Sequence, residues 1–455
     1  MTSKFGKKSC PTPIYFDNNA TTLICEPAKK VHMEWLSCYN ASSDSKIAKP
    51  ATLLLEKASD AVLAQCGVSS ATHTAIFTSG GTESNCFVIR ACVKAYKKKL
   101  LEKNTHLKPH IITSATEHHS IMECLKDLEE TGDIEVTYIA PTIYGTILAE
   151  DVEKEIRPAQ TCLITVMFAN NEVPVINNIE EIGQVAHKNH IPLHSDCVQV
   201  FGKYKIDMLR HNIDALSASA HKFYGPKGVG LLIISKTLIE GYGLTAEING
   251  SQQHNLRGGT ENIAGIASLV MALKWAFGNR KSKNQKLFNL REYALEKIAK
   301  NYHMGDFLDY ASGNNDVTQH PPLELLSLGP PEDKKGFILP NTLLISVVKN
   351  RGKPFCNIDL KKFLDAKNCV VSIGSACMTS SDKASHVLTA IGAPPVVKRG
   401  VLRISFGDHN IKAEVDKFVT ILKQGIEKQC ADIRPELAEY ERQYKAAQAE
   451  EKAQS

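Results

Sequence analysis

Short apolar runs rich in β-branched residues alternate with helix-forming stretches over the first half of the chain. Seven such runs precede residue 236, at 74–79, 110–115, 136–141, 162–169, 191–196, 215–220 and 230–235. Each run has the length of one strand, and the segments between most of them can hold the helix that joins two parallel strands. This alternation predicts an α/β fold whose large domain contains a mostly parallel seven-stranded sheet.

The second half of the chain shows a different pattern of helical, polar and strand-like segments. A helical segment at 269–300 leads into a polar stretch at 311–336 that is rich in Gly, Asn and Pro, which predicts a loop insertion. Further strands are expected at 342–348, 370–376 and 401–407. An amphipathic helix follows, with Val415, Phe418, Val419, Leu422 and Ile426 on one face. This pattern predicts a smaller α+β domain.

The expected boundaries divide the chain into four parts. The large domain is predicted at 26–270 and the small domain at 271–430, with residues 1–25 joining the small domain. The polar end, 431–455, is expected to be a frayed helical tail rather than an ordered element.

Composition excludes several classes of protein. The 455 residues carry a formal net charge of only +5, which argues against a nucleic-acid-binding role, and we interpret the basic run 97–99 as a solvated helix end. No apolar stretch reaches the ~18 residues of a membrane span. The thirteen cysteines contain no CxxC pair, so neither a disulfide framework nor a metal site is expected. The N-terminus lacks the apolar core of a secretory signal, and we expect a cytoplasmic protein.

The segment SASAHKFYGPKGVG, residues 217–230, places Lys222 between a strand end and a glycine-rich turn. A lysine in that setting can present its amine to the aldehyde of a cofactor. Asp196 ends another strand, and a carboxylate there could keep a pyridinium nitrogen protonated, as a pyridoxal ring requires. A single lysine is more often a solvated surface residue, but its neighbours here favour a pyridoxal phosphate site.

A phosphate site is expected beside Lys222. The segment FTSGGTESN places Gly81 and Thr82 at a strand-to-helix junction, where free backbone amides and the helix dipole favour an anion. Ser219 and His221 flank Lys222 and can donate hydrogen bonds to the same phosphate.

Three more side chains follow strands and could face the cofactor or its substrate. The imidazole of His118 could stack on a cofactor ring and shuttle a proton near neutral pH. Asn171 offers an amide, and the planar guanidinium of Arg403 suits a substrate carboxylate.

Cys377 decides between possible reactions. It lies in SIGSACMTSSDKASH, where small and polar neighbours predict an exposed loop carrying one thiol rather than a buried cysteine. A thiolate on such a loop can attack a sulfur atom of a cofactor-bound substrate.

These segments, taken together, resemble the NifS/IscS-like cysteine desulfurases, which are pyridoxal-phosphate enzymes of the class V aminotransferase family. The matching segments, in chain order, are YFDNNATT, FTSGGTESN, TEHHSI, FANNEV, HSDCVQVFGK, SAHKFYGPKG, LRGGTEN, LPNTLLIS, GSAC and LRISFG. The resemblance implies the fold type I architecture of PLP-transferases, a homodimer, and L-cysteine as the substrate.

The resemblance also implies a role for each site residue. Lys222 would form the Schiff base and abstract the substrate proton, and Cys377 would take the sulfur as a persulfide, leaving L-alanine. The other roles are Asp196 at the pyridine nitrogen, Gln199 at the ring hydroxyl, His118 stacked on the ring, Gly81, Thr82, Ser219 and His221 at the phosphate with Thr260 of the partner chain, and Asn171 and Arg403 at the substrate carboxylate.

Some features depart from the family, and other functions stay open. The segment YNASSDSKIAKP, at 39–50, replaces a GNPSS-like segment, and NNEVPVI has a proline where a glycine is usual. Sulfur delivery to an iron–sulfur scaffold protein or to tRNA thiolation is the expected outcome. A selenocysteine lyase, a true aminotransferase that would not need Cys377, and a catalytically weak binding scaffold are the alternatives.

Overall fold

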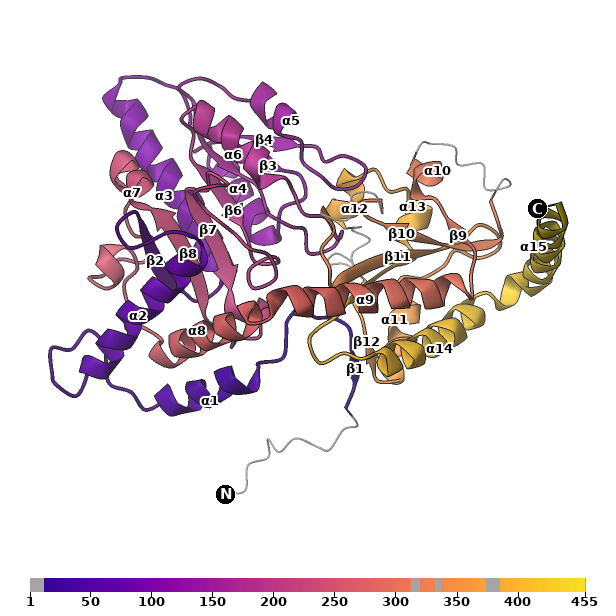
Figure 1. The fold of residues 1–455 in the computed structure, drawn as a ribbon. Helices are drawn as coiled ribbons and strands as arrows, with labels where there is room; N and C mark the ends of the chain where they lie inside the picture. Colours follow the sequence, from indigo (N-terminus) through magenta and orange to yellow (C-terminus); the bar gives the residue numbers. More distant parts are fainter. Residues whose placement is uncertain (1–11, 312–319, 332–336, 374–384, 455) are drawn as a thin grey trace.

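The computed structural model describes residues 12–311, 320–331, 337–373 and 385–454. A seven-stranded sheet forms the centre of the larger part, with the strand order β2-β8-β7-β6-β5-β3-β4 (Figure 1). The strands are β2 (His73–Thr78), β3 (His110–Ser114), β4 (Glu135–Ile139), β5 (Thr161–Thr165), β6 (Leu193–Asp196), β7 (Ala215–Ser219) and β8 (Gly230–Ser235). Of these, β8 alone runs in the direction opposite to the other six, so the prediction of a mostly parallel seven-stranded sheet is confirmed.

Helices cover both faces of this sheet because neighbouring strand residues point to opposite sides. Ile111 and Leu163 pack with helices α3 (Gly81–Glu102), α4 (His119–Glu130) and α7 (Lys236–Tyr242). The next residue on each strand, Ile112 and Ile164, packs with α2 (Lys49–Gln65), α6 (Ile179–Lys188) and α8 (Ile263–Phe277). Helix α1 (Glu26–Trp35) lies against α8, and α5 (Ala149–Lys154) lies against α6.

A second, four-stranded sheet forms the core of the smaller part, in the order β13-β11-β10-β9. Its strands are β9 (Met304–Gly305), β10 (Leu323–Leu328), β11 (Thr342–Lys349) and β13 (Val401–Ser405). One face packs against α9 (Arg280–Ala299), α11 (Asn357–Ala366) and α14 (Lys412–Gln429), and the other against α10 (Phe307–Ala311), α12 (His386–Ala390) and α13 (Pro395–Lys398). The five apolar residues predicted to share one face of α14 are all buried, which confirms that helix.

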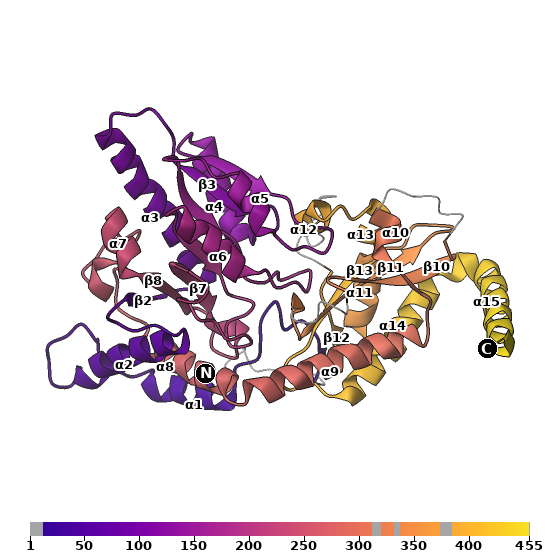
Figure 2. The same ribbon diagram turned by 45° about the horizontal axis from the view of Figure 1, so that its top comes forward.

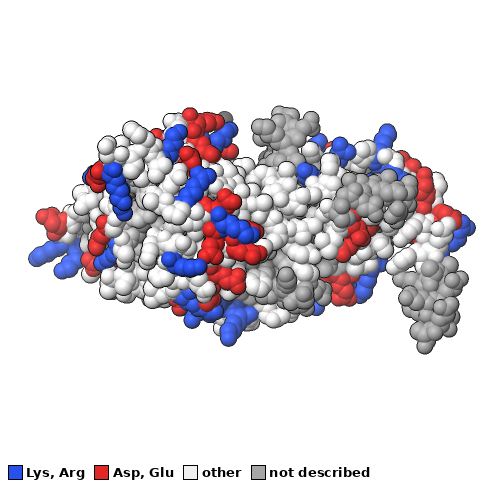
Figure 3. Space-filling view, turned by 90° about the horizontal axis from the view of Figure 1, so that it is seen from above, with Lys and Arg blue, Asp and Glu red and all other residues white. Residues whose placement is uncertain are grey.

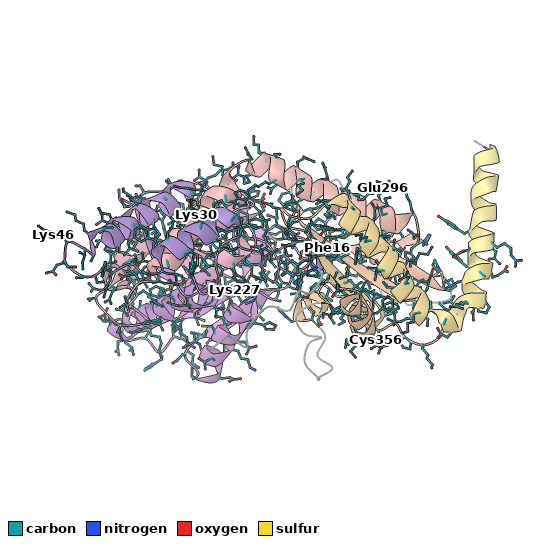
Figure 4. All side chains as sticks on the ribbon, turned by 90° about the horizontal axis from the view of Figure 1, so that it is seen from below. Phe16, Lys30, Lys46, Lys227, Glu296 and Cys356 are labelled. Atoms are coloured by element: carbon teal, nitrogen blue, oxygen red, sulfur yellow. The ribbon has the colours of Figure 1, made fainter. Side chains whose placement is uncertain are left out.

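The first described residues pack with the smaller part. Strand β1 (Ile14–Tyr15) pairs in parallel with β12 (Cys369–Val370). Phe16, labelled in Figure 4, is fully buried and packs edge-on against Phe406 and Phe418. The domain limits proposed from the sequence stay a prediction, and these contacts agree with an N-terminal segment that joins the small domain.

Four predictions about the second half need correction. The stretch 311–336 is not simply a loop, because it contains β10, an inner strand of the second sheet. The strand expected at 370–376 is reduced to β12, and residues 374–376 lie outside the described part. The helix expected at 269–300 is two helices separated by Gly278 and Asn279.

The fourth correction concerns the C-terminal segment, which forms the expected helix, α15 (Arg434–Gln454), but whose first turns are packed rather than frayed. Its first turns are held by Leu437, which packs on the small core, and by Tyr440 and Tyr444, whose rings contact His303. Figures 1 and 2 show α9 running from the end of α8 to the second sheet, and α15 projecting beyond that sheet. Three short 3-10 helices, η1 (Ala220–Lys222), η2 (Gln253–Asn255) and η5 (Ala431–Ile433), complete the elements named here.

None of the helices in the described ranges combines the length and the apolar composition needed to cross a bilayer.

Candidate active site

A cavity of about 330 Å³ opens at the carboxyl ends of the parallel strands, where β6 and β7 finish and α3 and α4 begin. Arg403 closes it from the side of the second sheet. Ten of the residues predicted from the sequence line this cavity: Gly81, Thr82, His118, Asn171, Asp196, Gln199, Ser219, His221, Lys222 and Arg403. The structure therefore brings together predicted residues that lie up to 322 positions apart in the chain, between Gly81 and Arg403.

Lys222 ends the short helix η1, directly after β7. Its Nζ donates hydrogen bonds of 2.6 Å to the carbonyl oxygen of Asn19 and 2.9 Å to that of Ala20. Burial, with a smaller contribution from the positive charge of Arg403, lowers the pKa of Lys222 from its ordinary 10.5 to about 8. A useful fraction of this amine is therefore unprotonated, and nucleophilic, near neutral pH.

The turn after Lys222 is held in a strained conformation. Tyr224 has φ +68°, in the left-handed region that non-glycine residues rarely adopt. Its backbone N–H donates to Thr22 Oγ1 at 2.8 Å, and its hydroxyl donates to Asp408 Oδ1 at 3.0 Å. These contacts fix the turn against both the N-terminal segment and the segment that follows β13.

Asp196 lies at the end of β6 and is almost fully buried. Its Oδ1 accepts a hydrogen bond from the Val198 N–H at 2.9 Å, and its Oδ2 accepts one from Asn85 Nδ2 at 2.8 Å. These two donors fix the orientation of the buried carboxylate, which could accept a hydrogen bond from a pyridinium nitrogen.

His118 is oriented by the start of α4, for which it is the N-cap residue. Its Nδ1 accepts a hydrogen bond from the Ser120 N–H at 3.1 Å, and Ser120 Oγ lies 2.9 Å from the same nitrogen. Nδ1 is thus the acceptor, which leaves the proton of the neutral ring on Nε2. Burial lowers the pKa of His118, so the neutral imidazole is favoured.

The start of α3 forms the anion-binding end of the cavity. A Cβ at Gly81 would lie 2.8 Å from Val198 Cγ2, so a larger residue at this position would have to displace that side chain. No side chain caps the first amides of α3 in the described part of the chain, so they can bind an anion together with Thr82 and Ser219. Burial and the charge of Lys222 lower the pKa of His221 to about 4, so its imidazole would donate to a phosphate as a neutral ring.

Arg403 is 6% exposed and is held by two partners. Nη1 donates to the carbonyl oxygen of Asn171 at 2.8 Å, and Nη2 pairs with Asp17 Oδ1 at 2.8 Å. Each terminal nitrogen keeps a second N–H, so the guanidinium can still bind a carboxylate in the cavity.

The sequence analysis assigned no role to three residues that hold this site. Asn85 bridges Asp196 and Ser120 Oγ, with Nδ2 distances of 2.8 and 2.9 Å. The carbonyl of Asn19 accepts from both Lys222 Nζ and Gln199 Nε2, and Asp17 pairs with Arg403. A signal was present, because all three lie in the matching segments YFDNNATT and FTSGGTESN.

Two predicted site residues are not part of this cavity. Thr260 is exposed and does not line the cavity of its own chain. Cys377 lies outside the described residues, so its position stays a prediction.

Comparison with known proteins identifies the family. The family model described as Aminotransferase class-V matches residues 14–317. A protein named Cysteine desulfurase IscS from Methanosarcina thermophila is 34% identical over 433 residues, covering 91% of this chain and 92% of the relative. A protein of the same name from Clostridium botulinum (strain Hall) is 34% identical over 440 residues, covering 94% of this chain and 97% of the relative.

Solved structures agree with these relatives. A structure described as a NifS-like protein superposes with a TM-score of 0.75 at 27% identity, covering 91% of this chain and 99% of that one. The NifS-like protein from Rickettsia africae gives a TM-score of 0.72 at 25% identity, with coverages of 91% and 99%. The chain therefore belongs to the class-V aminotransferase family, whose fold and lysine-bearing cavity are described above, and within it to the cysteine desulfurases. The resemblance inferred from the sequence segments is confirmed.

This family works with pyridoxal phosphate, and the residues present fit that cofactor. The cavity places an amine, a buried carboxylate and an uncapped helix start around one space. Two buried acceptor atoms at its wall, Gln199 Oε1 and Asn85 Oδ1, have no hydrogen-bond partner in the described structure. Unpartnered buried acceptors are costly, and a ligand with polar ring substituents would satisfy them.

Proposed function

We propose that this chain is a pyridoxal-phosphate-dependent cysteine desulfurase that acts on free L-cysteine. The observation that carries the proposal is the placement of Lys222, with its lowered pKa, in one cavity with Asp196 and Arg403. Bound there, pyridoxal phosphate supplies an aldehyde for the substrate amine and a ring that withdraws electrons from it.

The chain's own residues divide the remaining work. Gly81, Thr82, Ser219 and His221 hold the phosphate. Asp196 keeps the ring nitrogen protonated, Gln199 bonds the ring hydroxyl, and His118 stacks on the ring. Asn171 and Arg403 bind the substrate carboxylate and so orient the substrate α-carbon toward Lys222 Nζ, which takes its proton.

Sulfur transfer depends on Cys377. Its thiolate attacks the substrate sulfur, an S–S bond forms at Cys377, and the bond between the substrate β-carbon and sulfur breaks. The electron pair of the broken bond stays on the substrate, which gains a proton at carbon and leaves as L-alanine. The persulfide on Cys377 is then available to an acceptor, for which an iron–sulfur scaffold protein or a tRNA-thiolating system is proposed.

The test is production of L-alanine and sulfide from L-cysteine by the protein loaded with pyridoxal phosphate, in the presence of a thiol reductant. We expect equimolar products from the unaltered protein and none from Lys222→Ala or Cys377→Ser. Pyridoxal phosphate should still bind to Cys377→Ser. Unchanged sulfide release by Cys377→Ser would contradict a role for Cys377, and cofactor binding without turnover of L-cysteine would favour selenocysteine as substrate or a binding scaffold.

The proposal also covers the oligomeric state of the protein and its place in the cell. We propose a homodimer in which Thr260 completes the phosphate site of the partner subunit. We also propose that the protein acts in the cytoplasm.

A further inference from the structure

Lys203 is a buried lysine that none of the roles above uses. Its exposed fraction is 7%, and its Nζ donates a hydrogen bond of 2.9 Å to the carbonyl oxygen of Gln199. Burial is the main reason that the pKa of Lys203 falls from 10.5 to about 7, with a smaller contribution from the charge of Lys222. The side chain is thus largely a neutral amine slightly above neutral pH, which avoids most of the free-energy cost of burying a charge.

The turn after β6 explains why a lysine reaches this carbonyl. The N–H groups of Val200 and Phe201 both donate to the carbonyl of Cys197, which begins a helical turn. Gly202 then has φ +85°, and the N–H of Lys203 donates to Val200 instead of Gln199. In a continuing α-helix the amide of residue 203 would bond to the carbonyl of residue 199. Here the side chain of the same residue provides that bond.

This turn packs directly on the turn that carries Lys222. A Cβ on Gly202 would lie 2.8 Å from the Cβ of Phe223, and the rings of Phe201 and Phe223 are 5.3 Å apart. The outer side of the turn is fixed by α9, because Asn284 Nδ2 donates to the Lys203 carbonyl at 2.6 Å. The turn is therefore held by two bonds: one from the Lys203 side chain to the Gln199 carbonyl, and one from α9 to the Lys203 carbonyl.

The two turns also share one acceptor at the cavity wall. Gln199 Nε2 and Lys222 Nζ donate to the same Asn19 carbonyl, at 3.2 and 2.6 Å. A displacement of the Gln199 backbone would move its amide group relative to both the cavity and this carbonyl.

We propose that Lys203 is a positioning residue: its bond to the Gln199 carbonyl sets where the Gln199 side chain meets the cofactor ring. The proposal rests on the proposed function, because that function assigns Gln199 to the ring. Lys203 itself does not touch the cavity, so it acts only through Gln199.

The test measures the affinity of pyridoxal phosphate for the cofactor-free protein and its Lys203→Met variant. Methionine keeps the length of the side chain and removes the donor, so we expect binding about tenfold weaker, as for one lost hydrogen bond of 1.4 kcal/mol. Lys205→Met is the matched control, because Lys205 is exposed two residues further along, and it should bind as the unaltered protein does.

A double-mutant cycle separates positioning from general damage. In a Gln199→Ala background, Lys203→Met should cause little further loss, since the side chain that it positions is gone. In a Thr82→Ala background, which alters the phosphate end, the tenfold loss should persist in full. Equal losses in both backgrounds would overturn the proposal, as would unchanged affinity of Lys203→Met.

Two further results keep the outcome clear. Should Lys203→Met fail to fold, Lys203→Gln and Lys203→Ala replace it. Lys203→Gln keeps a hydrogen-bond donor without the charge, so it should bind pyridoxal phosphate more tightly than Lys203→Ala does. Equal affinities of these two variants would also overturn the proposal. If the unaltered protein binds no pyridoxal phosphate, the proposed function fails first, and that result is distinct from a failure of the Lys203 proposal.

Discussion

Burial, more than residue type, sets the chemistry of single residues at this site. It lowers the pKa of Lys222 to about 8 and that of His221 to about 4, and it raises the pKa of Glu117 to about 8. Each shift favours the neutral form, and for Lys222 and Glu117 that form is not the one that water would favour at neutral pH. At the cavity wall, a useful fraction of the Lys222 amine is therefore uncharged and able to react with a bound aldehyde.

Glu117 gives a direct test of this effect. Its Oε1 accepts hydrogen bonds from Ser114 Oγ at 2.7 Å and from the Met167 N–H at 2.8 Å, and burial is the main cause of its raised pKa. Between pH 4.5 and about 8 the folded protein keeps a proton that the unfolded chain has lost, so stability falls as pH rises through this range.

Glu117→Gln should remove that pH dependence, because an amide does not titrate. We expect the melting temperature of Glu117→Gln, relative to the unaltered protein, to rise steadily between about pH 5 and pH 8. Thermal unfolding of both proteins over this range checks the prediction. A difference that stays constant with pH would mean that Glu117 is ionised in the folded state.

Arg403→Lys tests whether the planar guanidinium of Arg403 is needed to bind the substrate carboxylate. A lysine keeps the charge but cannot bond Asn171, Asp17 and a substrate carboxylate in one plane, so KM for L-cysteine should rise about tenfold or more, with a smaller change in kcat. Steady-state kinetics measure both constants. The control is Arg399→Lys at an exposed position, which should leave them unchanged; an equal effect of both substitutions would remove Arg403 from the substrate site.

At the scale of elements, the turn of residues 222–225 joins the site to the rest of the molecule. Its left-handed residue is Tyr224, although Gly225 follows it. Gly225 is needed for a different reason: a Cβ there would lie 2.8 Å from the Cβ of Ala220. A left-handed tyrosine costs about 1–3 kcal/mol, so its contacts must offset that cost.

Tyr224→Phe should therefore destabilise the folded protein measurably. It removes the hydroxyl that donates to Asp408 Oδ1 and accepts from the Asp408 N–H, and we expect a loss of about 1–3 kcal/mol in the free energy of unfolding. Urea unfolding measures this loss. Tyr302→Phe is a suitable control, since the buried hydroxyl of Tyr302 has no partner in the described structure and its removal should cost nothing. Equal losses for both variants would show that the Asp408 contact does not hold the turn.

The elements also show what the sequence could and could not predict. The seven strands were predicted because each apolar run has the length of one strand. The polar residues that follow them were predicted to share a site because the carboxyl ends of parallel strands lie at the same edge of the sheet. β10 was missed because LELLSL breaks the period of two at Leu325–Leu326, in a strand that is buried on both faces, and because Gly and Pro flank it. Its one charged residue, Glu324, is bonded by Tyr310 and Asn350, contacts that depend on the fold.

At the site, too, contacts that depend on the fold could not be predicted from the sequence. Lys222, Asp196 and Arg403 carry charges that suggest their chemistry from sequence alone. Asn19 acts through its backbone carbonyl, and Asn85 acts by bridging two other side chains, so neither role follows from residue type.

At the scale of the whole molecule, charge and exposed apolar surface have different distributions. Figure 3 shows acidic and basic side chains interspersed on the face that it presents, with no large area of one sign. Four apolar side chains on and after α1 are, by contrast, more than half exposed: Met33, Leu36, Tyr39 and Ile47. Figure 4 places Lys46, beside Ile47, at the outer end of the molecule. Several exposed apolar side chains within one stretch of the chain suit a protein interface.

This apolar surface adjoins the segment that carries Thr260. Ser42 Oγ donates to Glu261 Oε2 at 3.3 Å, and Ala41 packs against Ile263. A second copy docked on this face would lie next to Thr260, which is exposed in a single chain. This position is consistent with the proposal that Thr260 serves the cavity of the partner subunit.

Mixed dimers decide whether Thr260 acts across the interface. We would combine one chain carrying Lys222→Ala with another carrying Thr260→Glu, whose carboxylate repels a phosphate, and purify the mixed dimer by two different tags. If Thr260 serves the partner, one cavity has its own Lys222 and an intact Thr260 from the Lys222→Ala chain, while the other cavity carries both changes. We therefore expect about half of the activity of the unaltered dimer, although either homodimer alone should be nearly inactive. If Thr260 instead serves its own chain, each cavity of the mixed dimer carries one damaging change, and mixing restores nothing.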